Sequence, residues 1–188
     1  MAGAEIHVGL VHHPVYDRQK KIVATNITNF DVHDIARVCR CYGVKSYSLI
    51  HPSEEQLMFV SRIRDHWVTG YGKKFNPLRS EALDYIYTAK SIAEAAKNHG
   101  ITQIYATSAR VHEGFKSLSF KSLKEQILTE ESQEQILLLF GTGFGLSREV
   151  FEQCDGILEP IAGSSRTDFR HLSVRSAVGI ALDRLVGS

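Results

Sequence analysis

The sequence predicts an α/β domain with a doubly wound, mostly parallel sheet, and three observations carry this prediction. Short apolar or β-branched runs alternate with helical patterns along the whole chain. The run QILLLF at 135–140 is apolar throughout, as in a strand buried on both faces of a parallel sheet. The 188 residues are 43% hydrophobic and 23% charged, which is typical of a globular protein, and this length favours a single domain over 1–188.

Local signals predict the first strand and the first helix. Residues 6–15 (IHVGLVHHPV) contain several β-branched residues, and Pro14 ends the strand. A polar loop rich in Asn and Thr leads to a helix over 31–43. Asp31 is expected to cap this helix, and Gly43 lies where a helix-terminating glycine belongs.

The next part of the chain is expected to contain two strands and two helices. A strand at 45–50 precedes a helix over 53–67, which opens with the capping-box pattern SEEQ. The segment 68–80 holds two glycines, a proline and a lysine pair, so it is expected to be a loop. A strand at 82–87 and a helix over 89–98 follow.

The second half continues the same alternation. The strand at 135–140 is expected to be central. In parallel sheets ligands bind at the carboxyl ends of strands, so the loops after Val15, Thr107, Phe140 and Ile161 are the expected place of a site. The other predicted elements are strands over 101–107 and 156–161 and helices over 119–129, 147–153 and 172–186.

Composition excludes several classes of function. Lys and Arg total 22 against 21 Asp and Glu, so no global basic field indicates a nucleic-acid partner, and any RNA would be bound through a local patch. The longest apolar stretch, 136–140, is too short to span a membrane. The N-terminus lacks the positive region of a signal peptide. No membrane association is therefore expected.

The cysteines and histidines do not indicate a metal site. Cys39, Cys41 and Cys154 form no CxxC pair, which favours free thiols in a reducing compartment and predicts a cytoplasmic location. Adjacent His12 and His13 point to opposite sides of a strand and lack metal-ligand spacing to any cysteine. No bound metal is expected.

The strongest local signal is GTGFGL at 141–146, directly after the apolar strand. Its three glycines permit positive φ and close approach of a ligand to the backbone. A dinucleotide fingerprint fits poorly, because the spacing is GxGxG and little chain follows it. A P-loop is excluded because no GK[ST] follows. A plain strand-to-helix turn stays open as the simplest alternative.

Four segments together resemble the SPOUT class of RNA methyltransferases. They are DVHDIARVCRCYG at 31–43, LLLFGTGFGLS at 137–147, LEPIAG at 158–163 and HLSVRSAVGIALDRL at 171–185. They occur in the order of that class and extend over nearly the whole chain. The resemblance implies a C-terminal trefoil knot and a homodimer that uses S-adenosylmethionine. It also implies methyl transfer to a tRNA or an rRNA.

The resemblance also implies a set of cofactor-binding residues in three loops. Mostly backbone groups would hold the adenine and the ribose, and the glycines act by lacking a side chain. The predicted cofactor residues are Thr107, Gly141, Thr142, Gly143, Leu146, Leu158, Glu159, Ile161, His171, Leu172 and Ser173.

Two residues are candidates for catalysis. Arg37 aligns with the arginine of the family's first motif, where a guanidinium could position a phosphate or stabilise a developing 2′-alkoxide. Asp168 offers a carboxylate that suits proton removal from guanine N1. The motif departs from the family because Asp31 replaces its leading Asn and His33-Asp34 replace Gly-Asn. Both guanine N1 and ribose 2′-O therefore stay open as acceptors.

RNA binding and assembly are expected to depend on local patches. Clustered cations would contact phosphates. Apolar stripes on the first and last helices are expected to pack across a two-fold axis, and a dimer would bring Arg37 to the other chain's cofactor. Two alternatives remain: an RNA-binding protein without activity that keeps the knot, and a nicotinamide- or nucleotide-binding domain. The RNA-binding candidates are Arg18, Lys20, Lys21, Lys73 and Lys74.

Overall fold

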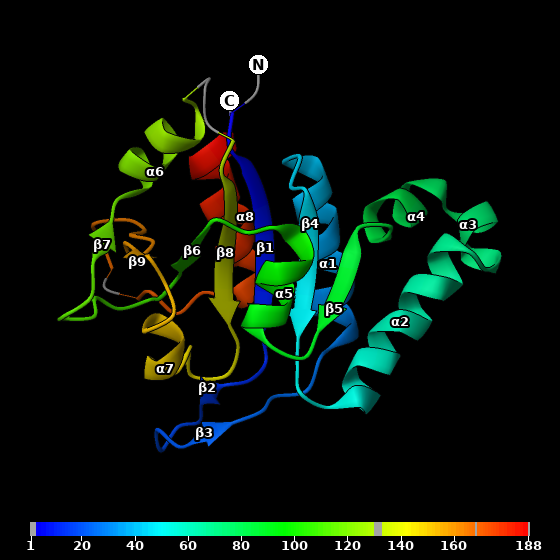
Figure 1. Cartoon of the computed structure of the whole chain (residues 1–188), viewed down its shortest axis with the longest axis horizontal. Coiled ribbons are helices and arrows are strands. Elements are labelled where there is room, and N and C mark those ends of the chain that lie inside the picture. The colour runs from blue at the N-terminus through cyan, green and yellow to red at the C-terminus, as the bar shows by residue number, and fades with distance from the viewer. Residues whose placement is uncertain (1–2, 130–132, 168, 188) are drawn as a thin grey trace.

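The computed structural model describes residues 3–129, 133–167 and 169–187. These form a seven-stranded parallel sheet in the order β5-β4-β1-β8-β6-β9-β7 (Figure 1). A short hairpin of β2 (Val15–Tyr16) and β3 (Ile22–Val23) follows the first strand. The sheet strands are β1 Glu5–Val11, β4 Ser46–Ile50, β5 Ile86–Ala89, β6 Gln103–Ala106, β7 Ser117–Leu118, β8 Gln135–Gly141 and β9 Gly156–Leu158.

The most apolar strand is central, as predicted. β8 lies between β1 and β6, and its residues 136–140 are buried. Its register with β1 pairs Ile6 with Ile136 and Leu10 with Phe140. Helices cover both faces of such a strand, so apolar side chains are favoured at every position rather than at alternate ones.

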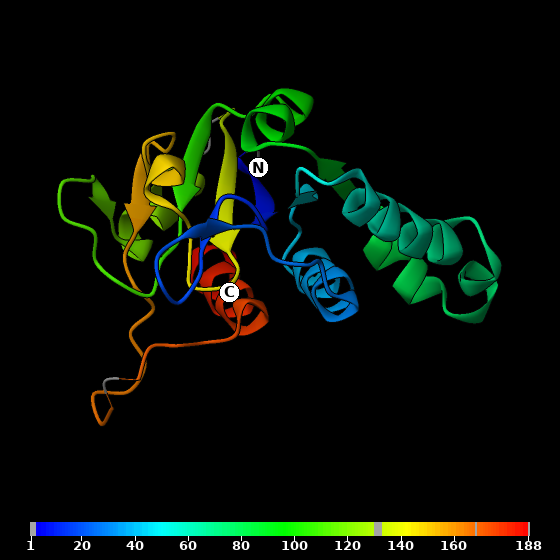
Figure 2. The ribbon, with the colours of Figure 1, turned by 90° about the horizontal axis from the view of Figure 1, so that it is seen from below.

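Helices cover both faces of the sheet, which confirms the doubly wound α/β prediction (Figure 2). One face packs against α1 (Asn29–Cys41), α6 (Phe120–Ile127) and α8 (Val174–Val186). The other face packs against α5 (Ile92–His99) and α7 (Arg148–Phe151). Three further helices extend beyond the β5 edge of the sheet. They are α2 Glu54–Val68, α3 Tyr71–Phe75 and α4 Pro77–Leu83.

The prediction of a loop over 68–80 is wrong, because this segment contains α3 and the start of α4. Asn76 caps α4 by accepting a hydrogen bond from the Arg79 amide at 3.0 Å, and Pro77 occupies the first helical turn, where its missing amide costs nothing. Gly and Pro here mark helix ends rather than an irregular loop. The strand expected at 82–87 is therefore found later in the chain, as β5, and the helix expected over 89–98 begins at Ile92.

The first strand and the first helix also begin or end elsewhere than predicted. β1 ends at Val11, before the cis His13–Pro14 bond. Thr28 caps α1 instead of Asp31: its hydroxyl accepts from the Asp31 amide at 3.2 Å and donates to the Asp31 carboxylate at 2.6 Å. β9 is likewise shorter than the strand expected at 156–161.

The apolar stripes of the first and last helices pack against each other within one chain, which corrects the predicted packing across a two-fold axis. Ile35 on α1 and Val178 and Leu182 on α8 are buried in one core. The Tyr42 hydroxyl donates to the Asp183 carboxylate at 3.0 Å. These buried positions are therefore not available to a second copy, and homodimerisation stays a prediction, as does the knot.

Within residues 3–129, 133–167 and 169–187, no helix is long and apolar enough to cross a membrane. In the same ranges, no three His, Cys, Asp or Glu side chains gather as metal ligands would.

Candidate functional site

A cavity of about 1,100 Å³ opens at the carboxyl edge of the sheet, where the loops after β1, β6, β8 and β9 meet the start of α8. Every residue of the predicted cofactor set lines this one cavity. The strand-end rule predicted this location, and the four loops named from the sequence all contribute to it. The structure thus brings the set together, while its role in binding stays a prediction.

The glycine loop after β8 is shaped by its own contacts. A Cβ on Gly141 would lie 2.8 Å from the Leu146 amide nitrogen. Gly143 has a φ of +59°, and its Cβ would lie 3.0 Å from the Tyr16 carbonyl oxygen. These glycines therefore let the loop fold tightly against the β2–β3 hairpin. This packing explains the glycine at position 143 more directly than the expected close approach of a ligand does.

A chain of hydrogen bonds fixes the loop to the end of β1. The Thr142 hydroxyl donates to the Val11 carbonyl at 3.1 Å and lies 2.5 Å from the Thr25 hydroxyl, which lies 3.1 Å from Nδ1 of His12. The bonds are consistent if Thr25 donates to Thr142 and Nδ1 of His12 donates to Thr25. Burial lowers the pKa of His12 to about 4, so the ring is neutral at pH 7 and carries its proton on Nδ1.

Replacing Thr142 with valine is expected to destabilise the fold by about 1–2 kcal/mol, because the hydroxyl's two partners would lose a half-buried hydrogen bond. Urea unfolding followed by circular dichroism measures the change. Thr142→Ser keeps the hydroxyl and serves as the matched control. If both variants unfold at the same urea concentration, the network does not hold the loop.

One wall of the cavity carries an ion pair that sequence reasoning missed. Arg175, on the first turn of α8, contacts the buried Asp31 carboxylate at 2.7 Å and lies 3.7 Å from the Asp34 carboxylate. Asp31 thus supplies a charge that the family's Asn would lack, and this charge neutralises Arg175. The departure from the motif was visible in the sequence, but its partner was not, because α1 and α8 are far apart in the chain.

Two other polar residues of the cavity are partly engaged by helix ends. The Glu159 carboxylate accepts from the Phe120 amide at 2.7 Å, at the start of α6. The Ser173 hydroxyl caps α8 by accepting from the Ser176 amide at 3.2 Å. The second Glu159 oxygen is free of any described hydrogen bond, so one acceptor on this wall can serve a ligand.

The predicted RNA-binding residues do not form one patch. Arg18 and Lys20 line the cavity at the β2–β3 hairpin, whereas Lys21 does not. Lys73 and Lys74 are exposed on α3, which extends beyond the other edge of the sheet (Figure 1). The five cations thus divide into two separate groups.

Of the two catalytic candidates, Arg37 lies within the described residues. Arg37 does not line the cavity; it lines a second hollow on the other side of α1. Asp168 lies outside the described residues. The predicted catalytic pair therefore stays a prediction.

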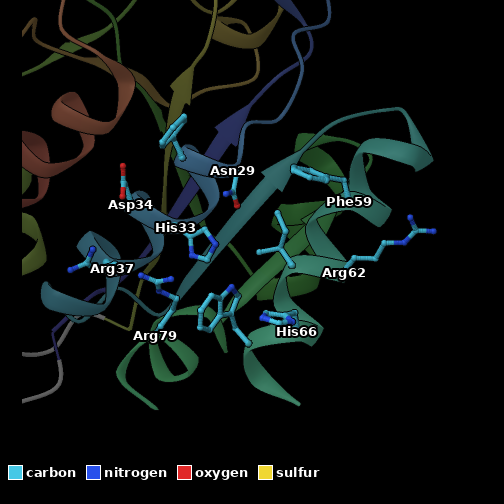
Figure 3. A pocket seen from close by; sticks show the side chains of 11 residues that line it. Asn29, His33, Asp34, Arg37, Phe59, Arg62, His66 and Arg79 are labelled. Atoms are coloured by element: carbon cyan, nitrogen blue, oxygen red, sulfur yellow. The ribbon is translucent and has the colours of Figure 1, made fainter. Parts of the chain in front are cut away.

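The second hollow is a groove of about 510 Å³ between α1, α2 and α4, and we call it the α1–α2 groove. Figure 3 shows His33 of α1 and Arg79 of α4 pointing toward each other, with Phe59, Arg62 and His66 supplied by α2. Burial, and then the charge of Arg79, lower the pKa of His33, so its ring is neutral at pH 7. The groove is lined by Asn29, Phe30, His33, Asp34, Arg37, Phe59, Arg62, Ile63, His66, Trp67 and Arg79.

The fold is that of solved SPOUT-type methyltransferase structures. A probable methylase from Haemophilus influenzae aligns over 97% of this chain and 65% of its own, with a TM-score of 0.65 and 16% identity. An AdoMet-bound rRNA methyltransferase from Sinorhizobium meliloti aligns over 98% of this chain and 56% of its own, with a TM-score of 0.56 and 17% identity. At these identities the likeness shows the fold alone.

The sequence comparison identifies the family. Residues 5–187 match the family described as SAM-dependent RNA methyltransferase, and the chain belongs to it. It is 36% identical over 190 residues to a tRNA (guanine-N(1)-)-methyltransferase from Oleidesulfovibrio alaskensis, covering 98% of this chain but 43% of that protein. It is 33% identical to an uncharacterized protein from Aquifex aeolicus, covering 98% of this chain and 90% of that protein. The chain thus spans about two fifths of the guanine-N1 relative.

Proposed function

We propose that this chain transfers a methyl group from S-adenosylmethionine to guanine N1 of a tRNA. The observation that carries the proposal is the single cavity that collects the glycine loop, the segment after β9 and the start of α8. Membership of the SAM-dependent RNA methyltransferase family supports the cofactor and the RNA. The name of the longer Oleidesulfovibrio relative supports guanine N1 as the acceptor.

The donor groups in the cavity fit this cofactor. Apolar side chains of Leu146, Leu158 and Leu172 offer walls for a purine, and the backbone of 141–146 offers amides and carbonyls for a ribose. The Glu159 carboxylate offers a negative charge for a cationic ligand. When bound, S-adenosylmethionine supplies an electrophilic methyl group. The chain must orient the acceptor toward it and accept the acceptor's proton.

The proposed proton acceptor is Asp168, by the resemblance to the family. The Asp31 carboxylate lines the cavity, but it already accepts from Thr28 and from Arg175, so it has little capacity left to act as a base. A role of Arg37 in catalysis needs a second chain, because Arg37 does not line its own cavity. The proposal therefore includes a cytoplasmic homodimer in which Arg37 acts in the partner's cavity.

Methylation of unmodified tRNA tests the proposal. The purified protein is incubated with isotope-labelled S-adenosylmethionine and tRNA, and the digested nucleosides are identified by mass spectrometry. Labelled 1-methylguanosine is the expected product. A labelled 2′-O-methyl ribose would overturn the choice of acceptor atom. RNA binding without any binding of S-adenosylmethionine in calorimetry would overturn the enzyme and favour the RNA-binding protein without activity.

A further inference from the structure

The α1–α2 groove carries positive charge that has no described counter-charge. The guanidinium groups of Arg37, Arg62 and Arg79 make no ion pair or hydrogen bond with any residue in the described ranges. Neighbouring arginines on the same two helices behave differently: Arg40 pairs with Glu81, and Arg64 pairs with Asp84 at 3.0 Å. The unpaired arginines on α1 and α2 are thus those that line the groove.

The acidic member of the groove is already partly compensated. Asp34 lines the groove, and its carboxylate lies 3.7 Å from Arg175 Nε, outside the groove. Asp34 therefore cannot neutralise three guanidinium groups. In Figure 3, Arg37 and Arg62 lie on opposite sides of the groove, with Arg79 between them. A ligand that carries several negative charges along its length would meet Arg62 and Arg79 together.

Aromatic side chains lie among these charges. Phe30 and Phe59 are 69% and 39% exposed, respectively. Trp67 is half-buried, and the Arg79 guanidinium stacks 4.4 Å from the centre of its ring. Unpaired bases stack on exposed aromatic faces and on guanidinium planes, while Arg side chains bind the phosphates between them.

We propose that the α1–α2 groove binds an unpaired segment of the RNA substrate, with phosphates at Arg62 and Arg79 and a base on Phe59. This inference rests on the proposed function, since it takes the substrate to be RNA. Alternating charge and exposed ring favour a single strand over a duplex, whose bases are stacked inside. The groove's volume lies within the range of roughly 300–1,000 Å³ for ligand pockets.

The groove and the cofactor cavity lie on two sides of the same helix start. Asn29, Phe30 and His33 line the groove, whereas Thr28 and Asp31 line the cavity. Arg175 of the cavity wall lies 5.7 Å from the centre of the Phe30 ring. One RNA strand that crosses the first turn of α1 could therefore place a nucleotide in the cavity and its neighbours in the groove.

Binding of a fluorescein-labelled single-stranded RNA, followed by anisotropy at several salt concentrations, tests the groove. Arg62→Gln with Arg79→Gln is expected to weaken binding at least tenfold and to flatten the plot of log affinity against log salt by about one unit per lost phosphate contact. Arg40→Gln with Arg64→Gln removes the same charge from outside the groove and should leave affinity unchanged. Calorimetry should give the same S-adenosylmethionine affinity for both pairs.

Two further variants test whether a loss of RNA binding comes from the groove and not from a folding defect. Arg62 is exposed and has no described partner, so Arg62→Glu alone cannot disturb the Trp67 stack and should still weaken binding. Phe59→Ala should weaken binding without changing the salt dependence, because it removes a stacking surface and no charge. A duplex of the same sequence should bind more weakly than the single strand.

The outcomes distinguish a failure of the proposed RNA-binding groove from a failure of the proposed methylation. If the Arg62–Arg79 double variant binds RNA with wild-type affinity and salt slope, the proposed groove is wrong. If the double variant loses self-association in sedimentation, this face is a contact between two copies, and the proposed groove is also wrong. If the double variant loses RNA binding while the wild-type protein methylates nothing, the groove stands and the proposed reaction fails. If methylation has an unchanged KM in the double variant, the reaction stands and the groove fails.

Discussion

Replacing Gly143 with valine is expected to weaken S-adenosylmethionine binding at least tenfold. Gly143 adopts a φ of +59°, which a β-branched residue adopts only with strain, and its Cβ would press on the Tyr16 carbonyl at 3.0 Å. The loop must shift away from the β2–β3 hairpin, and Thr142 and Leu146 shift with it. Isothermal titration calorimetry measures the loss. Thermal unfolding should show a destabilisation of about 1–2 kcal/mol as well.

Gly100 provides the matched control. It has a φ of +62°, ends α5, and has open space where a Cβ would lie. Gly100→Val therefore introduces the same backbone strain away from the cavity. We expect this variant to lose comparable stability and to keep its cofactor affinity. Equal losses of affinity in the two variants would mean that general destabilisation, and not the loop, explains the effect of Gly143→Val.

Acid is expected to destabilise the fold by about 3 kcal/mol through His12 alone. Burial lowers the pKa of His12 from 6.5 to about 4, although the charge of Asp31 opposes this shift. Above pH 6.5 the ring is neutral in both states and contributes nothing. Between pH 6.5 and 4 the unfolded chain takes up a proton that the folded chain refuses, so stability falls with pH. Below about pH 4 both states are protonated and the loss levels off.

Urea unfolding from pH 7 to pH 4 measures this dependence. His12→Gln removes the titrating group, so its free energy of unfolding should fall less steeply over the same range. Proton NMR of the His12 ring gives an independent reading, with a midpoint near pH 4 in the folded protein. A midpoint near 6.5 would contradict the buried, neutral ring. Burial also lowers the pKa of His51, which lies 6.1 Å from the His12 ring centre, so some acid sensitivity should remain.

The fold and the cavity were largely predictable, because their signals are local. QILLLF marks a strand buried on both faces, and the strand-end rule then predicts a site at GTGFGL without knowledge of the packing. Helix capping was less predictable. Asp31 looks like a cap in the sequence, but Thr28 takes that role, and the Asp31 side chain is turned toward Arg175.

The α1–α2 groove could not be predicted, because it depends on how distant helices pack. Lys73 and Lys74 attracted attention as a visible charge pair, yet they lie on α3 and line neither hollow. Arg62 and Arg79 are isolated charges in the sequence, and they meet only because α2 and α4 fold back beside α1. The spacing of Arg62 and Arg79 along the chain does not indicate that they lie close together in the fold.

The position of β1 in the sheet has a consequence for synthesis on the ribosome. β1 is paired on one side with β4, which ends at Ile50, and on the other with β8, which begins at Gln135. At translation rates of roughly 5–20 residues per second, the backbone N–H and C=O groups on one edge of β1 stay unpaired for several seconds until β8 is made. Such an edge can pair with another nascent chain. The cofactor pocket is completed last, so the cofactor cannot assist the nascent chain before β8 has been made.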